Sequence, residues 1–168
     1  PKRNDKNIEK RNKRSPKANL LVICDYNEYH TYILFNLLTE ISKYLRENFV
    51  VYIKFHPAKN IEVKMLNDLD YKLTEKPISK LVDDIDVVFT SSTTTASLEL
   101  FCAGKHVISV LDNKFLNMSP LREVKDVNFI SNSDQLLKSL KNYNHTNENI
   151  KSSDIFHLNS NLESWIDL

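Results

Sequence analysis

Short apolar runs rich in valine and isoleucine alternate along this chain with longer stretches whose apolar residues recur at helical spacing. Leu-Leu-Val-Ile-Cys at 20–24 and Phe-Val-Val-Tyr-Ile-Lys-Phe at 49–55 are two such runs. Strands of a parallel sheet have this form, because both of their faces are covered. The alternation predicts βαβ units, and hence an α/β fold with a mostly parallel sheet between two layers of helices.

We therefore expect a Rossmann-like three-layer sandwich with a sheet of about six strands and helices on both faces. The predicted strands are 20–24, 49–55, 71–73, 86–89, 106–111 and 127–130. The predicted helices are 29–47, 61–66, 77–84, a helix that follows 91–93 and ends at Gly104, 134–140 and 162–166. The polar stretch 142–153 is expected to be a loop.

Positive charge is concentrated at the N-terminus. Residues 1–18 carry eight basic side chains against two acidic ones, a balance of +6, whereas the whole chain has a net charge of +1. The rest must carry about −5 by difference, and a mildly acidic body argues against a nucleic-acid partner. We expect a basic linker or disordered arm over 1–18 and one nucleotide-binding domain over 19–168. The arm has two further candidate roles, contact with anionic lipid and contact with a neighbouring domain.

Two residue counts exclude several classes of protein. Gly104 is the only glycine, and a dinucleotide-binding turn or a P-loop needs several so that the backbone can approach phosphate. Cys24 and Cys102 lie in apolar segments without a C-x-x-C pair, and the five histidines are scattered. We therefore expect buried thiols rather than a disulfide, no metal and no cofactor.

Polar residues follow three of the predicted strands. His56-Pro57 comes after the second strand, 91–95 after the fourth and 112–114 after the fifth. Ligands of open α/β sheets bind in the crevice beyond the carboxyl ends of the strands. A binding site is therefore expected at this edge of the sheet.

The segment Thr-Ser-Ser-Thr-Thr-Thr at 90–95 places hydroxyl groups and main-chain N–H groups at the predicted start of a helix. A helix start has unpaired N–H donors and a partial positive charge, which suit a phosphate group. Ser91, Ser92 and Thr93 are the candidate phosphate ligands, with Thr94 as an accessory residue. The alternative is that Ser92 or Thr93 only caps the helix, although one cap needs fewer hydroxyls than this segment offers.

His56 is expected at the rim of the sheet, where its imidazole can hydrogen-bond a phosphate oxygen. Lys54 shares its strand face and can add positive charge, because side chains two residues apart on a strand point the same way. Pro57 has no N–H, so strand pairing should end there. Alternatively, His56 is an ordinary surface histidine before a strand-ending proline.

Glu99 is the only charged residue of the apolar stretch 96–103. On a buried helix a lone carboxylate needs a partner, and the two hydroxyls of a ribose can donate to its oxygens. Helical spacing equally allows Glu99 to lie on an exposed stripe. The sequence contains no recognisable Ser-His-Asp grouping, and its nearest carboxylate pair, Asp83-Asp84, is expected at a helix end. We therefore assign no catalytic residue to this chain.

Part of this pattern resembles a known family. Ser91-Ser92, then Glu99 five residues before Gly104, then Lys-His-Val-Ile at 105–108 resemble the C-terminal, nucleotide-binding domain of GT-B fold glycosyltransferases. In that family the strand–loop–helix segment contacts the donor phosphate and the glutamate binds the ribose. The resemblance thus implies that Glu99 binds ribose and that the hydroxyl segment binds phosphate.

The combination of His56-Pro57 with Ser91-Ser92 is more specific. It is similar to the HP and SS motifs of bacterial sialyltransferases and polysialyltransferases, which use CMP-sialic acid, and of related surface-carbohydrate biosynthesis proteins. The resemblance covers 52–111 well and the ends of the chain loosely. The first acidic residue of the motif in retaining enzymes has no counterpart here, because Ser92 stands seven residues before Glu99; this favours an inverting enzyme.

The resemblance implies the donor-binding domain of a bacterial glycosyltransferase that builds surface polysaccharide from a CMP-sugar. The family's general base lies in an N-terminal, acceptor-binding domain, so we expect a nucleotide-sugar donor and that domain as partners, and no activity from this fragment alone. The chain begins at Pro1 rather than methionine, which also favours a piece of a longer protein.

The expected location is the cytoplasm, with residues 1–18 touching the inner face of the membrane as one option. The chain has no apolar run near the roughly 20 residues that span a bilayer, and no apolar signal-peptide segment. Two alternatives to the transferase remain. One is a stand-alone flavodoxin-like or receiver-like module, for which Asp25 after the first strand is a partial match. The other is half of a nucleotide-sugar epimerase with the same fold.

Overall fold

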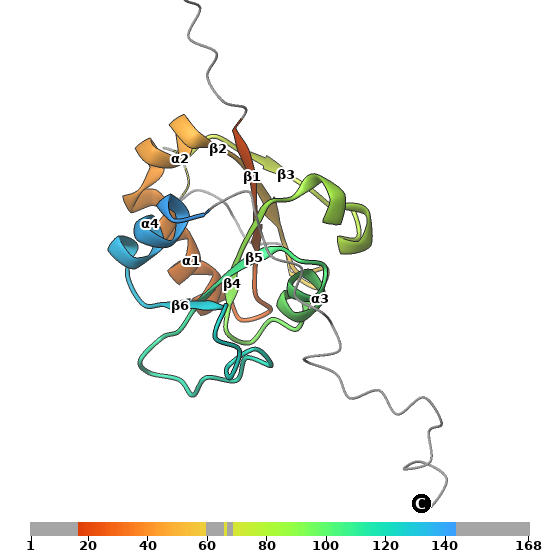
Figure 1. Ribbon diagram of the computed structural model, residues 1–168, viewed down its shortest axis with the longest axis vertical. Coiled ribbons are helices and arrows are strands. Elements are labelled where there is room, and N and C mark those ends of the chain that lie inside the picture. Colours follow the sequence, from red (N-terminus) through yellow and green to blue (C-terminus); the bar gives the residue numbers. More distant parts are fainter. Residues whose placement is uncertain (1–16, 60–65, 67–68, 144–168) are drawn as a thin grey trace, which may run out of the picture.

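The computed structural model describes residues 17–59, 66 and 69–143 (Figure 1). Within them, six strands form one all-parallel sheet in the order β3-β2-β1-β4-β5-β6. The strands are β1 (Ala18–Ile23), β2 (Phe49–Lys54), β3 (Tyr71–Leu73), β4 (Val87–Ser91), β5 (His106–Val110) and β6 (Asn128–Ile130). The predicted Rossmann-like sandwich is confirmed.

Helices cover both faces of this sheet. One layer consists of α1 (Glu28–Glu40), α2 (Ser42–Asn48) and α4 (Ser133–Lys141). The other consists of α3 (Ala96–Cys102) and two 3-10 turns, η2 (Ile78–Lys80) and η3 (Val82–Asp84). Figure 1 shows the first layer to the left of the sheet and α3 to its right.

Strand β1 is the central strand, and its apolar residues serve both layers. Leu20 and Val22 are fully buried against the α1–α2–α4 layer, whereas Leu21 and Ile23 are buried against the α3 layer. Burial of each such side chain contributes about 1.5–3 kcal/mol relative to exposure. A continuous apolar run is therefore needed here rather than an alternating one.

The strand order decides one alternative from the sequence. Flavodoxin-like and receiver-like sheets have the order 2-1-3-4-5, whereas 3-2-1-4-5-6 is the order of dinucleotide-binding sheets. The flavodoxin-like module is therefore wrong as a fold. In the observed order, β2 and β3 are added successively on one side of β1, whereas β4, β5 and β6 are added successively on its other side. The crevice between the carboxyl ends of β1 and β4 is the position where such sheets bind ligands.

The helix predicted over 29–47 is wrong as a single helix, because it is broken at Ile41 (φ −110°, ψ 16°). The hydroxyl of Thr39 donates to the carbonyl of Phe35 at 2.9 Å. Such a bond to the residue four positions earlier competes with the helix ladder and bends helices. Ile41 and Leu45 are both buried, so the apolar spacing that predicted one helix continues across the break.

The helix predicted over 77–84 is also wrong, since the segment forms η2 and η3. Pro77 is extended (ψ 149°) instead of starting a helical turn. The segment is too short to repay the cost of helix nucleation. Asp83 and Asp84 would also place negative charge at the unfavourable end of the helix dipole. Separate turns still bury Leu81 and Ile85.

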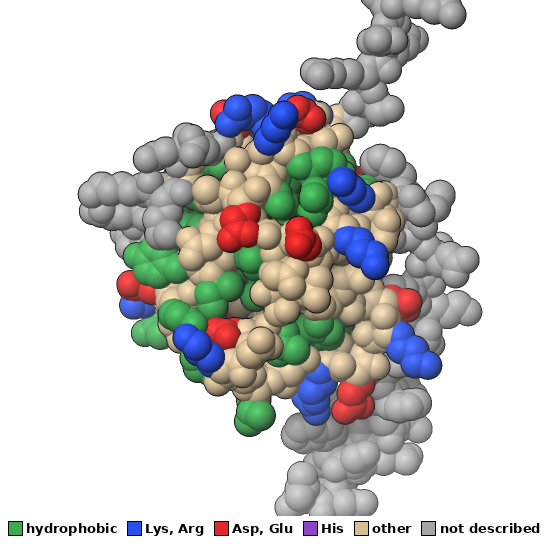
Figure 2. Space-filling view, turned by 90° about the vertical axis from the view of Figure 1, so that its left-hand side faces the viewer, with side chains coloured by type: hydrophobic (Ala, Val, Ile, Leu, Met, Phe, Trp, Pro, Cys, Tyr) green, Lys and Arg blue, Asp and Glu red, His purple; other side chains and the backbone are tan. Residues whose placement is uncertain are grey.

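Some predicted elements lie wholly or largely outside the described residues: the helix at 61–66 except Leu66, the helix at 162–166, most of the loop at 142–153, and residues 1–16 of the basic arm. In the part that is described, no helix is long and apolar enough to cross a membrane. Acidic and basic side chains are interspersed on the outer face of the α1–α2–α4 layer, as Figure 2 shows.

Candidate functional site

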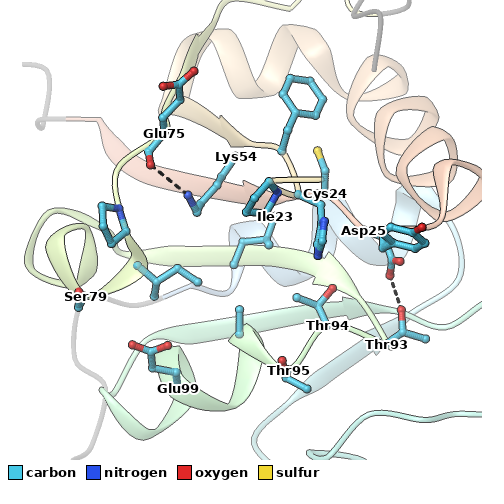
Figure 3. A pocket seen from close by; sticks show the side chains of 17 residues that line it. Ile23, Cys24, Asp25, Lys54, Glu75, Ser79, Thr93, Thr94, Thr95 and Glu99 are labelled. Atoms are coloured by element: carbon cyan, nitrogen blue, oxygen red, sulfur yellow. Dashed lines mark hydrogen bonds between the residues drawn. The ribbon is translucent and has the colours of Figure 1, made fainter. Parts of the chain in front are cut away.

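A pocket of about 700 Å³ lies at the carboxyl edge of the sheet, beside the point where the chain direction reverses (Figure 3). The residues that follow β1, β2 and β4 form most of its wall, and 75–79 and the first turn of α3 close it. The pocket therefore lies at the edge where parallel sheets bind their ligands. A volume of this size is typical of small-molecule sites.

The structure brings together most of the residues that the sequence singled out. Those that line the pocket are Lys54, His56, Pro57, Thr93, Thr94 and Glu99. Ser91 and Ser92 do not line it; they are 4% and 7% exposed and border a small separate cavity of about 10 Å³ beside His30 and Asp112. The two serines are therefore not placed for direct contact with a ligand in the large pocket.

The β2 side of the pocket carries its basic groups. The ammonium group of Lys54 donates to the carbonyls of Glu75 and Lys76, at 3.4 and 2.9 Å, and is held across the pocket by these bonds. Nδ1 of His56 accepts the N–H of Ala58 at 3.2 Å. The proton of the neutral imidazole must then reside on Nε2, which leaves this atom as a hydrogen-bond donor.

Glu99 lies on the opposite wall, on α3, and is exposed. The argument that a buried carboxylate here needs a partner is therefore wrong, and the exposed position that helical spacing also allowed is the observed one. The neighbours Leu100 and Phe101 take up the buried face of α3. Since Glu99 nevertheless borders the pocket, its carboxylate can accept hydrogen bonds from a ligand there.

The hydroxyl segment is arranged differently from the predicted helix start. Strand β4 continues to Ser91, and α3 begins only at Ala96 and has seven residues. Thr95 precedes the helix, and among the described residues no side chain caps it. The helix thus follows 91–93 as predicted, but the hydroxyl residues precede it rather than form its first turn, and neither Ser92 nor Thr93 caps it. We call the segment 91–95 the hydroxyl loop.

The hydroxyl loop is hydrogen-bonded to a pocket-lining residue that the sequence did not assign to the site. The carboxylate of Asp25, which follows β1 and is 8% exposed, accepts hydrogen bonds from the hydroxyls of Ser91 and Thr93. Burial alone would raise the pKa of Asp25, but these two hydroxyls, the N–H of Asn27 and the nearby His30 hold it below its ordinary value. The sequence did offer one indication of this role, because Asp25 is a carboxylate that follows the central strand closely.

Two other features of this edge concern metals and thiols. Among the described residues, no three His, Cys, Asp or Glu side chains gather in a way that could hold a metal ion. Cys24 and Cys102 are both free thiols, but Cys102 is only half-buried, so the expectation of a buried thiol is wrong at that position. Cys24 is buried beside the pocket, and burial raises the pKa of its thiol to about 12, so it is not a nucleophile there.

With this geometry described, the chain can be compared with known proteins. No protein-family model and no curated protein sequence matches it. Solved structures do match, and they show a GT-B-like fold, found in glycosyltransferases and in UDP-GlcNAc 2-epimerases.

Three of these structures illustrate the likeness. The UDP-GlcNAc 2-epimerase from Neisseria meningitidis, bound to UDP-GlcNAc, matches 90% of this chain and 45% of its own, with a TM-score of 0.59 and 13% identity. The wall teichoic acid polymerase TagF, solved with CDPG, matches 79% of this chain and 33% of its own, with a TM-score of 0.54 and 13% identity. The glycosyltransferase SnogD from Streptomyces nogalater matches 76% of this chain and 35% of its own, with a TM-score of 0.54 and 9% identity. The chain spans less than half the length of these proteins.

Proposed function

We propose that this chain is the donor-binding half of a nucleotide-sugar enzyme, and that the pocket beside β1, β2 and β4 holds the donor. One observation carries the proposal: six of the eight residues selected from the sequence for nucleotide binding line this one pocket. They come from β2, from the hydroxyl loop and from α3, which are far apart in the sequence. Its volume of about 700 Å³ is adequate for a nucleotide linked to a sugar.

The chemistry of the walls suggests how the donor is held. Lys54 and the Nε2–H of His56 offer positive charge and a donor to the phosphate. Thr93 and Thr94 flank it from the other side, and the exposed carboxylate of Glu99 accepts hydrogen bonds from the ribose hydroxyls. Ser91 and Ser92 act indirectly, since they lie behind the pocket wall.

We propose further that the whole enzyme is an inverting glycosyltransferase that uses a CMP-sugar to build a bacterial surface polysaccharide. The HP and SS motifs support this assignment. An acceptor hydroxyl would attack the anomeric carbon of the donor, and the bond from that carbon to the phosphate oxygen would break. The proton goes to a base of the other domain. Lys54 and His56 stabilise the negative charge that develops on the leaving phosphate.

A nucleotide-sugar epimerase is the second candidate. The observation in its favour is the fold of the Neisseria meningitidis epimerase, which extends over 90% of this chain. The two candidates differ in their products. An epimerase returns an isomer of the nucleotide sugar without an acceptor, whereas a transferase releases free nucleotide only when an acceptor is present.

Calorimetric titration with CMP, CDP, UDP and GDP tests donor binding. We expect a cytidine nucleotide to bind, and His56→Ala and Glu99→Ala each to weaken it about tenfold, because each removes a hydrogen bond to or from a charged group. Glu123→Ala, which alters an exposed glutamate outside the pocket, is the matched control and should bind as the unaltered chain does.

Each outcome discriminates between the claims. A preference for UDP or GDP would keep the donor site and remove the CMP-sugar assignment. No binding of any of the four at millimolar concentration would contradict the donor site itself. Binding that is equally strong in His56→Ala and Glu99→Ala would mean that the nucleotide lies elsewhere.

A further inference from the structure

At the carboxyl ends of β1 and β4, the buried carboxylate of Asp25 links the segments that end these two strands through hydrogen bonds. The two strands are neighbours in the sheet, with Ile23 paired to Thr90. The chain that follows Ile23 brings Asp25 beside the hydroxyl loop, 66 residues away from Ser91 in sequence. A carboxylate that is 8% exposed must be compensated by hydrogen bonds, because burying an unpaired charge is costly.

The direction of the hydrogen bonds follows from this charge. An ionised carboxylate can only accept, so Ser91 and Thr93 must both direct their single hydroxyl hydrogen toward Asp25. Ser91 Oγ also lies 3.0 Å from Thr94 Oγ1. Since the hydrogen of Ser91 is already used, Thr94 is the donor in that bond. Three hydroxyl hydrogens of the loop therefore point inward, directly or through Ser91, to one carboxylate.

Asp25 is itself firmly held by the start of α1. Its second oxygen accepts the N–H of Asn27 at 2.8 Å. Its main-chain N–H donates to the hydroxyl of Thr31 at 3.0 Å, and Thr31 is fully buried. Nδ1 of His30 lies 3.4 Å from the carboxylate. These contacts hold the carboxylate of Asp25 in one position in the folded core, and the hydroxyl loop is hydrogen-bonded to it.

The other contacts that order the loop lie toward its two ends: Ser91 pairs with Val110 in the sheet, and the hydroxyl of Ser97 donates to the carbonyl of Thr94 at 2.6 Å. Between them, the side chain of Thr93 is hydrogen-bonded to Asp25. The loop contains no glycine turn, its side chains at Thr93 and Thr95 are exposed, and among the described residues no side chain caps the helix that follows. We propose that Asp25 is a positioning residue, which holds the hydroxyl loop in the shape that forms the β4 wall of the donor pocket. This inference deepens the proposed function and rests on it for the identity of the ligand.

The first test needs no ligand. Asp25→Asn keeps the shape of the side chain but removes the charge. Its single carbonyl oxygen can replace only one of the two carboxylate oxygens, so either the two hydroxyls or the N–H of Asn27 faces an NH₂ group that cannot accept. Thr93→Val removes one of the two bonds at an exposed position. We expect the ¹⁵N order parameters of Thr93 and Thr94 to fall from rigid values near 0.85 toward 0.6 or below in both variants. Asp126→Asn, at an exposed turn, is the matched control and should leave them unchanged.

The second test measures binding of CMP, CDP, UDP or GDP, whichever binds the unaltered chain, and of the corresponding nucleoside. We expect Asp25→Asn to weaken nucleotide binding about tenfold and nucleoside binding less than twofold, because the loop borders the phosphate. The double variant with Thr93→Val should bind no more weakly than Asp25→Asn alone, since the two residues act through one contact. A purely structural effect would weaken both ligands and would be additive.

The two tests separate the claims. Unchanged order parameters in Asp25→Asn, or nucleotide affinity equal to or above that of the unaltered chain, would overturn the role of Asp25. If the unaltered chain binds no nucleotide, the proposed function fails, whereas the order parameters still decide whether Asp25 positions the loop.

Discussion

At the scale of single residues, the feature with the clearest energetic consequence is the buried carboxylate of Asp25. Its hydrogen bonds hold its pKa below the ordinary value of 3.8. A carboxyl group with a lowered pKa stabilises the fold fully above its ordinary pKa, and this contribution is lost as the pH falls through the lowered value. The charge therefore contributes stability at neutral pH.

Thermal unfolding of Asp25→Asn as a function of pH tests this contribution. At pH 7 we expect the variant to be less stable by about 1–3 kcal/mol, the cost of leaving buried partners unsatisfied. The difference from the unaltered chain should stay constant down to about pH 5 and close below the ordinary aspartate pKa of 3.8. A difference that is independent of pH down to 2 would show that the charge of Asp25 contributes nothing.

His106, at the start of β5, responds to pH in the range where histidines titrate. Burial lowers its pKa from the ordinary 6.5, and its Nε2 accepts from the amide of Asn128 at 3.2 Å, a bond that the protonated ring cannot accept. The unfolded chain binds this proton more readily, so stability falls as the pH drops below 6.5. We expect the melting temperature to fall more steeply between pH 7 and 5 than in His106→Gln. The same pH dependence of the melting temperature in the unaltered chain and in His106→Gln would contradict this role of His106.

At the scale of elements, the end of α3 depends on Gly104. Its φ of +76° lies in the left-handed region. The N–H of Gly104 donates to Phe101 at 2.9 Å and that of Lys105 to Leu100 at 3.0 Å, which is the Schellman arrangement. Apart from Gly104 itself and its two chain neighbours, no described residue has an atom within 4 Å of a Cβ placed at this position, so the cost of a side chain is one of backbone conformation.

Gly104→Ala should therefore destabilise the fold by about 1–2 kcal/mol, measured by urea unfolding. Gly104→Asn should cost less, because asparagine adopts this conformation more readily. Equal stability of Gly104→Ala and the unaltered chain would show that the helix can end in another way.

The elements also show what a single sequence can and cannot predict. All six strands were predicted. The inner strands β1, β4 and β5 were predictable because apolar β-branched runs such as 20–24 require burial on both faces, whereas the edge strands β3 and β6 are three-residue segments without such a run. The break at Ile41 was not, because the same apolar spacing runs through both helices. The delayed start of α3 was missed because a run of hydroxyl residues suits a helix start and a loop alike. Asp25 was missed because its partners Ser91 and Thr93 become neighbours only when β1 pairs with β4.

At the scale of the whole molecule, the strand order places the candidate site residues on one edge of the sheet. Lys54, Thr93 and Glu99 reach the same pocket only because β2, β1 and β4 are adjacent in the order 3-2-1-4-5-6. The strand-end rule therefore predicted the position of the pocket from sequence. It could not predict that Ser91 and Ser92 face away from it, since side-chain direction at a strand end depends on where the strand stops.

The measurement that tests the central claim most directly is mapping of the nucleotide site by amide chemical shifts. A ¹⁵N-labelled chain is titrated with CMP, CDP and UDP, and the shifted amides are assigned. We predict the largest changes at 54–56 and 93–96 and at Glu99, around the pocket, with none at the opposite edge of the sheet, at 84–86 and 103–106. Saturable changes confined to that opposite edge, or no changes at millimolar nucleotide, would contradict the account.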